Sequence, residues 1–137
     1  MGLIRSEGWE VRLAKTIEQW RRQHYVLGEY DCFRFALRAV EALTGVDLWP
    51  QFSGRYSTKR EALELMAEFG PSFDEVFSLV FQTRPQIMTH ARRGDICKYT
   101  DREPHLGVCT GAHAAVMKDD GLAFVSLDVC ECCWRIG

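Results

Sequence analysis

The sequence predicts an α+β domain in which N-terminal helices pack on a C-terminal antiparallel sheet. Helical hydrophobic spacing dominates residues 8–80, and short segments with strand-like spacing fill residues 86–137. The helices come first and do not alternate with the strands, which argues against a parallel βαβ sheet. With 137 residues, 47% of them hydrophobic, residues 1–137 are expected to form a single domain around one core.

The first two helices are indicated by spacing and by capping residues. A helix is expected over residues 8–24, because apolar residues recur there at helical intervals: Trp9, Leu13, Ile17 and Trp20. A second helix is expected to begin after Asp31, whose carboxylate suits an N-cap, and to end at Gly45. Its inward side is predicted to carry Cys32, Phe35, Ala36, Ala39, Val40 and Leu43.

Two further helices are expected before the sheet. Thr58 and Glu61 have the spacing of a capping box, which predicts a third helix that ends at Gly70 and Pro71. Its inward residues are predicted to be Ala62, Leu63, Met66 and Phe69. A short fourth helix is expected over residues 73–80.

Five strands are expected in the second half of the sequence. Their predicted ranges are residues 94–99, 105–110, 114–117, 122–127 and 132–136. The run Asp119-Asp120-Gly121 is typical of a hairpin turn and should join the third and fourth of these strands. The sequence shows no internal repeat and no linker.

Composition and charge exclude several classes of partner. The 17 Lys and Arg residues are balanced by 19 Asp and Glu, a net charge of -2, so nucleic acid is not an expected partner. No apolar run is long enough to span a membrane. Residues 1–10 lack the apolar core of a signal peptide, so we expect synthesis in a cytoplasm and reduced cysteines.

Cys32 and His105 are the residues best placed for chemistry. A cysteine in the first turn of a helix lies near unpaired backbone amides and the positive end of the helix dipole, which favour the thiolate. His105 opens an apolar strand, a rigid support for an imidazole that acts as a base. Each residue also has a structural interpretation: Cys32 as a small buried apolar group, and His105 as a strand-edge residue.

Three sequence motifs together resemble the NlpC/P60 family of papain-like cysteine peptidases. Residues 25–28, Tyr-Val-Leu-Gly, followed by Asp31-Cys32, resemble the approach to the family's nucleophile. Residues 93–96, Arg-Gly-Asp-Ile, resemble the turn that enters its first barrel strand. Residues 105–108, His-Leu-Gly-Val, followed by Gly111, resemble the strand that bears its catalytic histidine. The pattern from Tyr25 through Gly54-Arg55-Tyr56 to the terminal residues 134–137 is also similar to small phage and prophage proteins of this group, which are usually associated with tail-tip genes.

The resemblance implies a papain-like fold with a half-barrel, and hydrolysis of peptide bonds in peptidoglycan stem peptides without a cofactor. Cys32 would be the nucleophile and His105 its base. Tyr25 would donate a hydrogen bond to the oxyanion, and Asp31 would recognise a substrate amine, although its capping role explains it equally well. The implied partners are stem peptides and other tail-tip proteins. The implied location is the virion tail, which acts at the host periplasm and cell wall.

Some residues depart from the family pattern and support an alternative function. Phe33 and Arg34 replace the Ser and Gly that normally follow the nucleophile, and Met117 stands where a polar residue would orient the histidine. The alternative is a tail-tip subunit that keeps the fold for assembly and has weak or no catalytic activity. In that case Trp49 and Phe52, which lie in an expected loop, are candidate interface residues.

The C-terminal cysteines raise the question of a metal site. Cys130, Cys132 and Cys133 are closely spaced, and Cys97 or Cys109 could add a fourth thiolate. On a regular strand Cys130 and Cys132 would face one side and Cys133 the other, which is a poor arrangement for one metal ion. We therefore predict no metal and expect these residues to be free thiols.

Overall fold

The computed structural model describes residues 2–137 and confirms the predicted α+β class. Within these residues, four α-helices precede a five-stranded sheet. The helices are α1 (Trp9–Trp20), α2 (Cys32–Thr44), α3 (Lys59–Ala67) and α4 (Phe73–Phe81). The strands are β1 (Ile96–Asp101), β2 (Glu103–Cys109), β3 (His113–Lys118), β4 (Gly121–Ser126) and β5 (Cys130–Trp134).

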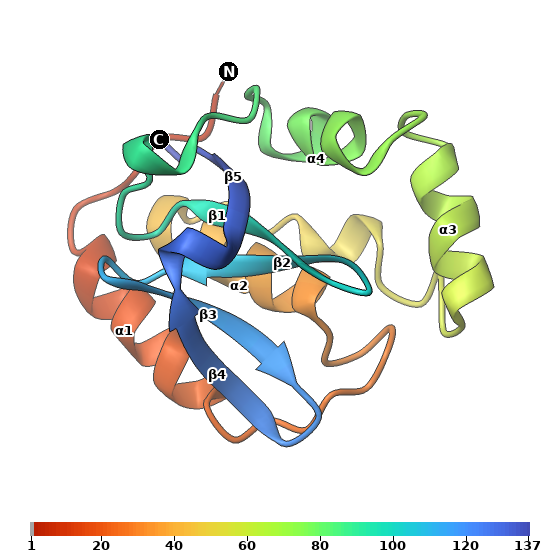
Figure 1. The fold of residues 1–137 in the computed structure, drawn as a ribbon, viewed down its shortest axis with the longest axis horizontal. Coiled ribbons are helices and arrows are strands. Elements are labelled where there is room, and N and C mark those ends of the chain that lie inside the picture. The colour runs from red at the N-terminus through yellow and green to blue at the C-terminus, as the bar shows by residue number, and fades with distance from the viewer. Residues whose placement is uncertain (1) are drawn as a thin grey trace.

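The sheet is antiparallel throughout and has the strand order β4-β3-β2-β1-β5. The predicted hairpin at Asp119 and Asp120 joins β3 to β4, with Lys118 opposite Gly121. The last strand, β5, crosses back to pair with β1 at one edge. This return brings the two chain ends together (Figure 1), where the Arg5 side chain donates a 2.7 Å hydrogen bond to the Ile136 carbonyl.

The predicted helix caps are confirmed in the structure. Asp31 caps α2 by accepting from the Arg34 amide, and Gly45 ends the helix with a left-handed backbone (φ 78°). Thr58 caps α3 by accepting from the Glu61 amide. These polar residues fix the start of each helix because they satisfy amides that the helix itself leaves unpaired.

Three predictions about helices were wrong in detail. The third helix, α3, ends at Ala67 rather than at Gly70 and Pro71, because the chain then turns and the Phe69 and Gly70 amides both donate to the Met66 carbonyl. The first helix ends at Trp20 rather than near residue 24, because the chain then turns toward the β3–β4 hairpin and the Leu122 amide donates to the Arg21 carbonyl. On α3, Leu63 is 57% exposed, and Leu65 is the buried leucine. Figure 1 shows α3 at the edge of the molecule, and Leu65 is its buried residue.

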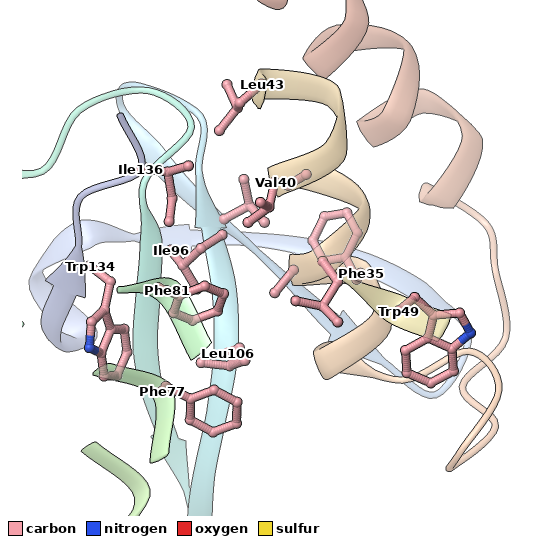
Figure 2. Close-up of a cluster of buried hydrophobic side chains, with 14 of the residues drawn as sticks. Phe35, Val40, Leu43, Trp49, Phe77, Phe81, Ile96, Leu106, Trp134 and Ile136 are labelled. Carbon is pink, nitrogen blue, oxygen red and sulfur yellow. The ribbon is translucent and has the colours of Figure 1, made fainter. Parts of the chain in front are cut away.

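The main core lies between the helices and one face of the sheet, and we call it the helix-side core. Figure 2 shows side chains of α2 facing those of the first two strands and the C-terminal segment. Phe35, Val40, Leu43, Ile96, Leu106 and Ile136 are all at most 1% exposed in this core. Phe77, Phe81 and Trp134 extend it beneath α4. This packing fixes α2 against β2, and so sets the position of Cys32 relative to the sheet.

A second apolar group, the far-side cluster, covers the opposite face of the sheet. It consists of Cys97, Cys109, Ala114, Val116, Cys130 and Cys133. The prediction that Cys130 and Cys132 share a face was wrong. The register between β1 and β5 shifts after Lys98, which pairs with Cys132, while Tyr99 pairs with Cys130. The resulting bulge at Glu131 turns Cys130 and Cys133 to the same face and leaves Cys132 against the helix-side core.

The proposed interface role of the loop at residues 49–52 is contradicted by burial. A 3-10 helix spans Trp49–Gln51, and it turns Trp49 and Phe52 into the helix-side core, where they are 6% and 5% exposed. Phe33 packs edge-on against both rings. These aromatic residues therefore stabilise the fold and are not available as surface anchors.

Candidate functional site

Cys32 is the first residue of α2, and its sulfur lies against the start of β2. Burial raises the pKa of the Cys32 thiol to about 12, while the backbone amides of Leu106 and of Cys32 itself act in the opposite direction. The carboxylates of Asp31 and Glu103 raise the pKa further. The Leu106 contact shows that the nucleophile candidate meets β2 one residue beyond His105.

His105 lies near the start of β2, at an open part of the sheet. Pairing of β2 with β3 begins at Gly107, opposite Val116, so the preceding residues of β2 are unpaired on that side. Strand alternation places His105 on the face of Gly107 and Cys109, opposite the face of Leu106. Both His105 and Cys32 line one groove, although no hydrogen bond joins their side chains in the described residues 2–137.

Asp31 holds the turn in front of the nucleophile candidate. One carboxylate oxygen accepts from the Arg34 amide at 2.9 Å, and the other accepts from the Gly28 amide at 2.9 Å and from the Tyr56 hydroxyl at 2.5 Å. The side chain is buried, with 2% exposure. These three bonds within the protein occupy the carboxylate and give Asp31 a structural role at the site.

Tyr25 is half-buried beside Cys32 and lines the same groove. Burial raises the pKa of its hydroxyl, and the neighbouring Cys32 and Asp31 raise it further. Tyr25 therefore stays protonated and able to donate a hydrogen bond at physiological pH. Its backbone amide donates to the Asp119 carbonyl at 3.0 Å, which ties this residue to the β3–β4 hairpin.

A groove of about 930 Å³ runs from Cys32 along the inner sides of α3 and α4. Polar side chains gather at the Cys32 end: Tyr25, Asp31, Tyr56, Lys59, Glu103 and His105. An ion pair between Lys59 and Glu103 joins α3 to β2 at this end. Most other lining residues are apolar, among them Leu65, Met66, Phe69, Val76 and Phe77. The site thus combines a polar end, where the thiol lies, with a long apolar wall.

Phe33 and Met117, which depart from the NlpC/P60 sequence pattern, are both partly buried in the structure. Phe33 lines the groove and packs edge-on against Phe52 and Phe77, so it forms part of the apolar wall. Met117 is half-buried on β3 and packs against the helix-side core. It provides no polar group to orient His105.

Tyr56 is a site residue that the sequence analysis missed. It lies in the loop before α3, is 6% exposed and donates to Asp31, and burial, followed by the Asp31 charge, raises the pKa of its hydroxyl. No local pattern around Tyr56 predicts this contact, since the two residues are joined only by the folding of the loop over α2. The sequence signal for Tyr56 was its place in the Gly54-Arg55-Tyr56 segment of the pattern that resembles small phage and prophage proteins.

Residues 2–137 contain neither a cluster of metal-ligating side chains nor a helix that could span a membrane. In this part of the chain, no three His, Cys, Asp or Glu side chains are grouped so that they could hold a metal ion. The helices described here are all too short or too polar to cross a bilayer.

Comparison with known proteins gives a family without a stated activity. Residues 4–136 match the model of a family described as a domain of unknown function (DUF6950). No curated protein matches the sequence. Because the family match spans nearly the whole sequence, the chain belongs to the DUF6950 family.

Proposed function

We propose that this protein is a cysteine hydrolase of papain-like, NlpC/P60-like fold that cleaves amide bonds in peptidoglycan stem peptides as part of a phage tail tip. One observation carries the proposal: the sulfur of Cys32, at the start of α2, meets the Leu106 amide, next to His105, at the polar end of an extended groove. The substrate and the tail-tip location rest on the sequence resemblance. The proposal of thiol chemistry is supported by the groove that Cys32 and His105 both line.

The proposed reaction has two chemical steps. Cys32 starts as a neutral thiol, because burial raises its pKa, and His105 takes the thiol proton as the sulfur attacks the substrate carbonyl. A carbon–sulfur bond forms, the carbon–nitrogen bond breaks, and His105 returns the proton to the leaving amine. Water then hydrolyses the thioester and restores the thiol. His105 lines the same groove as Cys32, beside the open edge of β2 where β3 is not yet paired, and the proposed step requires its imidazole to come within hydrogen-bond distance of the sulfur.

Two groups would stabilise the oxyanion of the intermediate. The Cys32 amide belongs to the first turn of α2, where backbone donors are unpaired, and the Tyr25 hydroxyl remains protonated. Asp31 supports the site indirectly, since it fixes the turn at Gly28 and the first turn of α2. Substrate contacts by Asp31 are not needed for this mechanism.

A second candidate function is a non-catalytic tail-tip subunit with the same fold. It is favoured by the raised pKa of Cys32 and by Met117, which leaves His105 without a polar partner from the expected position on β3. In that case the apolar groove would be a binding surface and Cys32 a buried thiol at its end.

Cleavage of purified stem peptides tests the proposed activity. We expect Cys32→Ala and His105→Ala each to reduce hydrolysis about a thousandfold or more, because each removes one partner of the proton transfer. The matched control is Cys132→Ala, which removes another half-buried thiol that lies outside the groove. Unchanged cleavage by the Cys32 variant would overturn the assignment of the nucleophile.

Alkylation separates the two candidate functions without any choice of substrate. We expect iodoacetamide to modify Cys32 at neutral pH in the wild type, and His105→Asn to slow this reaction at least about tenfold, since the imidazole assists loss of the thiol proton. If the rate at neutral pH is the same with and without His105, the non-catalytic subunit is the better interpretation.

A further inference from the structure

Cys97 and Cys133 lie directly opposite each other on neighbouring strands of the far-side cluster. Cys97 is in β1 and Cys133 is in β5, and they are partners in the antiparallel register. Both side chains are on the same face of the sheet and are at most 1% exposed. Neither residue lines the groove at Cys32, so the hydrolase proposal does not involve them.

The hydrogen-bond pattern defines the type of this cross-strand pair. The amide and carbonyl of Cys133 both bond to Gln86, on the side away from β1. Cys97 is paired on its other side with Gly107 of β2. Cys97 and Cys133 therefore form a non-hydrogen-bonded antiparallel pair, in which the two Cα atoms are about 4.5 Å apart. This separation falls within the roughly 4.4–6.8 Å range that a disulfide bridges.

The other cysteines of the cluster are less well placed to bond to Cys97. Cys109 follows Gly107, the partner of Cys97, by two residues, and Cys130 lies opposite Tyr99. Both are therefore diagonal neighbours, at a distance of about 7–8 Å between Cα atoms. In the reduced structure the thiols of Cys109 and Cys130 contact the Cys97 thiol, and these contacts, followed by burial, raise the pKa of Cys97. Their diagonal backbone separation of about 7–8 Å nevertheless lies beyond the roughly 4.4–6.8 Å that a disulfide bridges, whereas the directly opposite Cys133 lies within it.

We propose that Cys97 and Cys133 are a thiol pair that forms a disulfide between β1 and β5 when the protein meets an oxidising disulfide such as oxidised glutathione. One cysteine thiolate attacks the glutathione disulfide, which gives a mixed disulfide and releases one reduced glutathione. The second cysteine then attacks the mixed disulfide and releases another. Two cysteine protons are lost, one protein S–S bond forms, and one glutathione disulfide becomes two thiols.

The bond would fasten the edge strand of the sheet. The backbone of β5 pairs with β1 on one side, and on the other side it forms an isolated bridge to Gln86. In the reduced structure the Cys133 sulfur contacts the Ile87 carbonyl at 3.8 Å, so it must rotate from this partner toward Cys97. Opening of the edge strand gives the oxidant access to both sulfurs, and reclosure then holds the C-terminal strand covalently.

Oxidation of the whole protein in a glutathione redox buffer tests this proposal. The buffer contains urea below the unfolding midpoint, so that the edge strand opens, and the urea is then removed. We expect loss of two hydrogen atoms by intact mass and a cross-linked peptide that contains Cys97 and Cys133. The thermal midpoint should rise by about 10 °C, and dithiothreitol should reverse this rise.

Matched variants identify the pair. Cys109→Ala and Cys130→Ala should still form the cross-link, whereas Cys97→Ala and Cys133→Ala should not. Peptide mapping of the oxidised wild type identifies the two bonded cysteines directly, so the assignment does not depend on whether a variant folds. Recovery of a fully reduced protein, or of a cross-link through Cys109 or Cys130, would overturn the proposal.

Discussion

At the scale of a single residue, the properties of Cys32 depend on two opposed effects. The start of α2 and two backbone amides favour the thiolate, but the loss of water around the sulfur is larger, and the pKa rises to about 12. A thiol with this pKa is protonated at neutral pH. Any chemistry at Cys32 therefore requires a base that accepts its proton during the reaction, and His105 is the histidine that lines the same groove.

The raised pKa of Cys32 also predicts how stability changes in alkali. The unfolded chain ionises this thiol near pH 9, but the folded protein keeps the proton until about pH 12. The stability that the folded protein gains by keeping the Cys32 thiol protonated is therefore fully present below pH 9, and it is lost as the pH rises toward 12. We expect the free energy of unfolding to fall in this interval more for the wild type than for Cys32→Ala, by on the order of 1 kcal/mol.

Urea denaturation at several pH values measures this difference. Cys132 and Cys133, whose pKa values burial raises to about 11, are present in both proteins and contribute equally. Cys132→Ala removes a thiol outside the groove whose pKa is raised less, so its pH profile should lie between those of the wild type and Cys32→Ala. Parallel pH profiles for the wild type and the Cys32 variant would show that the thiol is not held in its protonated form.

At the scale of an element, the turn before α2 fixes the position of Cys32. Val26 and Tyr30 form an isolated bridge, and between them Gly28 has a left-handed backbone with φ 86°. A Cβ atom on Gly28 would lie 2.3 Å from the Tyr56 carbonyl oxygen, so no larger residue fits without movement of the backbone. The turn, the cap at Asp31 and the loop at Tyr56 therefore form one unit.

Two glycine substitutions separate backbone strain from this close contact. Gly45→Ala places a side chain on a left-handed residue that has no atoms near the new Cβ, and should cost about 1–2 kcal/mol. Gly28→Ala has the same strain plus the contact with Tyr56, and should cost at least about 2 kcal/mol more. Chemical denaturation measures both. Equal losses would mean that the loop at Tyr56 moves aside readily.

At the scale of the whole molecule, Asp95 joins segments from both ends of the chain. Its carboxylate accepts from the Arg5 side chain and from the Ile136 amide, each at 3.1 Å, and from the Arg92 amide at 2.9 Å. Asp95 is fully buried. Arg5 also donates to the Ile136 and Arg93 carbonyls, which holds its side chain between the two ends of the chain. Removal of Asp95 would leave the buried donors that bond to its carboxylate without an acceptor.

Asp95→Ala should therefore destabilise the protein by about 3–5 kcal/mol, the range for loss of one partner from a buried charged network. The control is Asp101→Ala, which removes an exposed partner of Lys118 and should cost less than about 1 kcal/mol. Thermal and urea denaturation compare the two variants. A loss for Asp95→Ala no greater than for the control would show that the two chain ends do not depend on this carboxylate.

Local patterns in the sequence determined the class of fold and most of its elements. The spacing of apolar residues and the caps at Asp31, Gly45 and Thr58 predicted α2 and the start of α3, because a cap is satisfied by amides only a few residues away. The strand patterns and the Asp119-Asp120-Gly121 turn predicted the β3–β4 hairpin for the same reason. The placement of Cys32 at the head of a helix was likewise a local property.

Only the tertiary structure decided which distant residues meet. The bulge at Glu131 puts Cys130 on the face of Cys133 and not of Cys132, since the register of β5 depends on its pairing with β1 and not on its own sequence. Packing buried Trp49 and brought Tyr56 to Asp31. It also determined that Cys32 meets β2 at Leu106 and that burial outweighs the helix dipole, because loss of water depends on every segment that covers the sulfur.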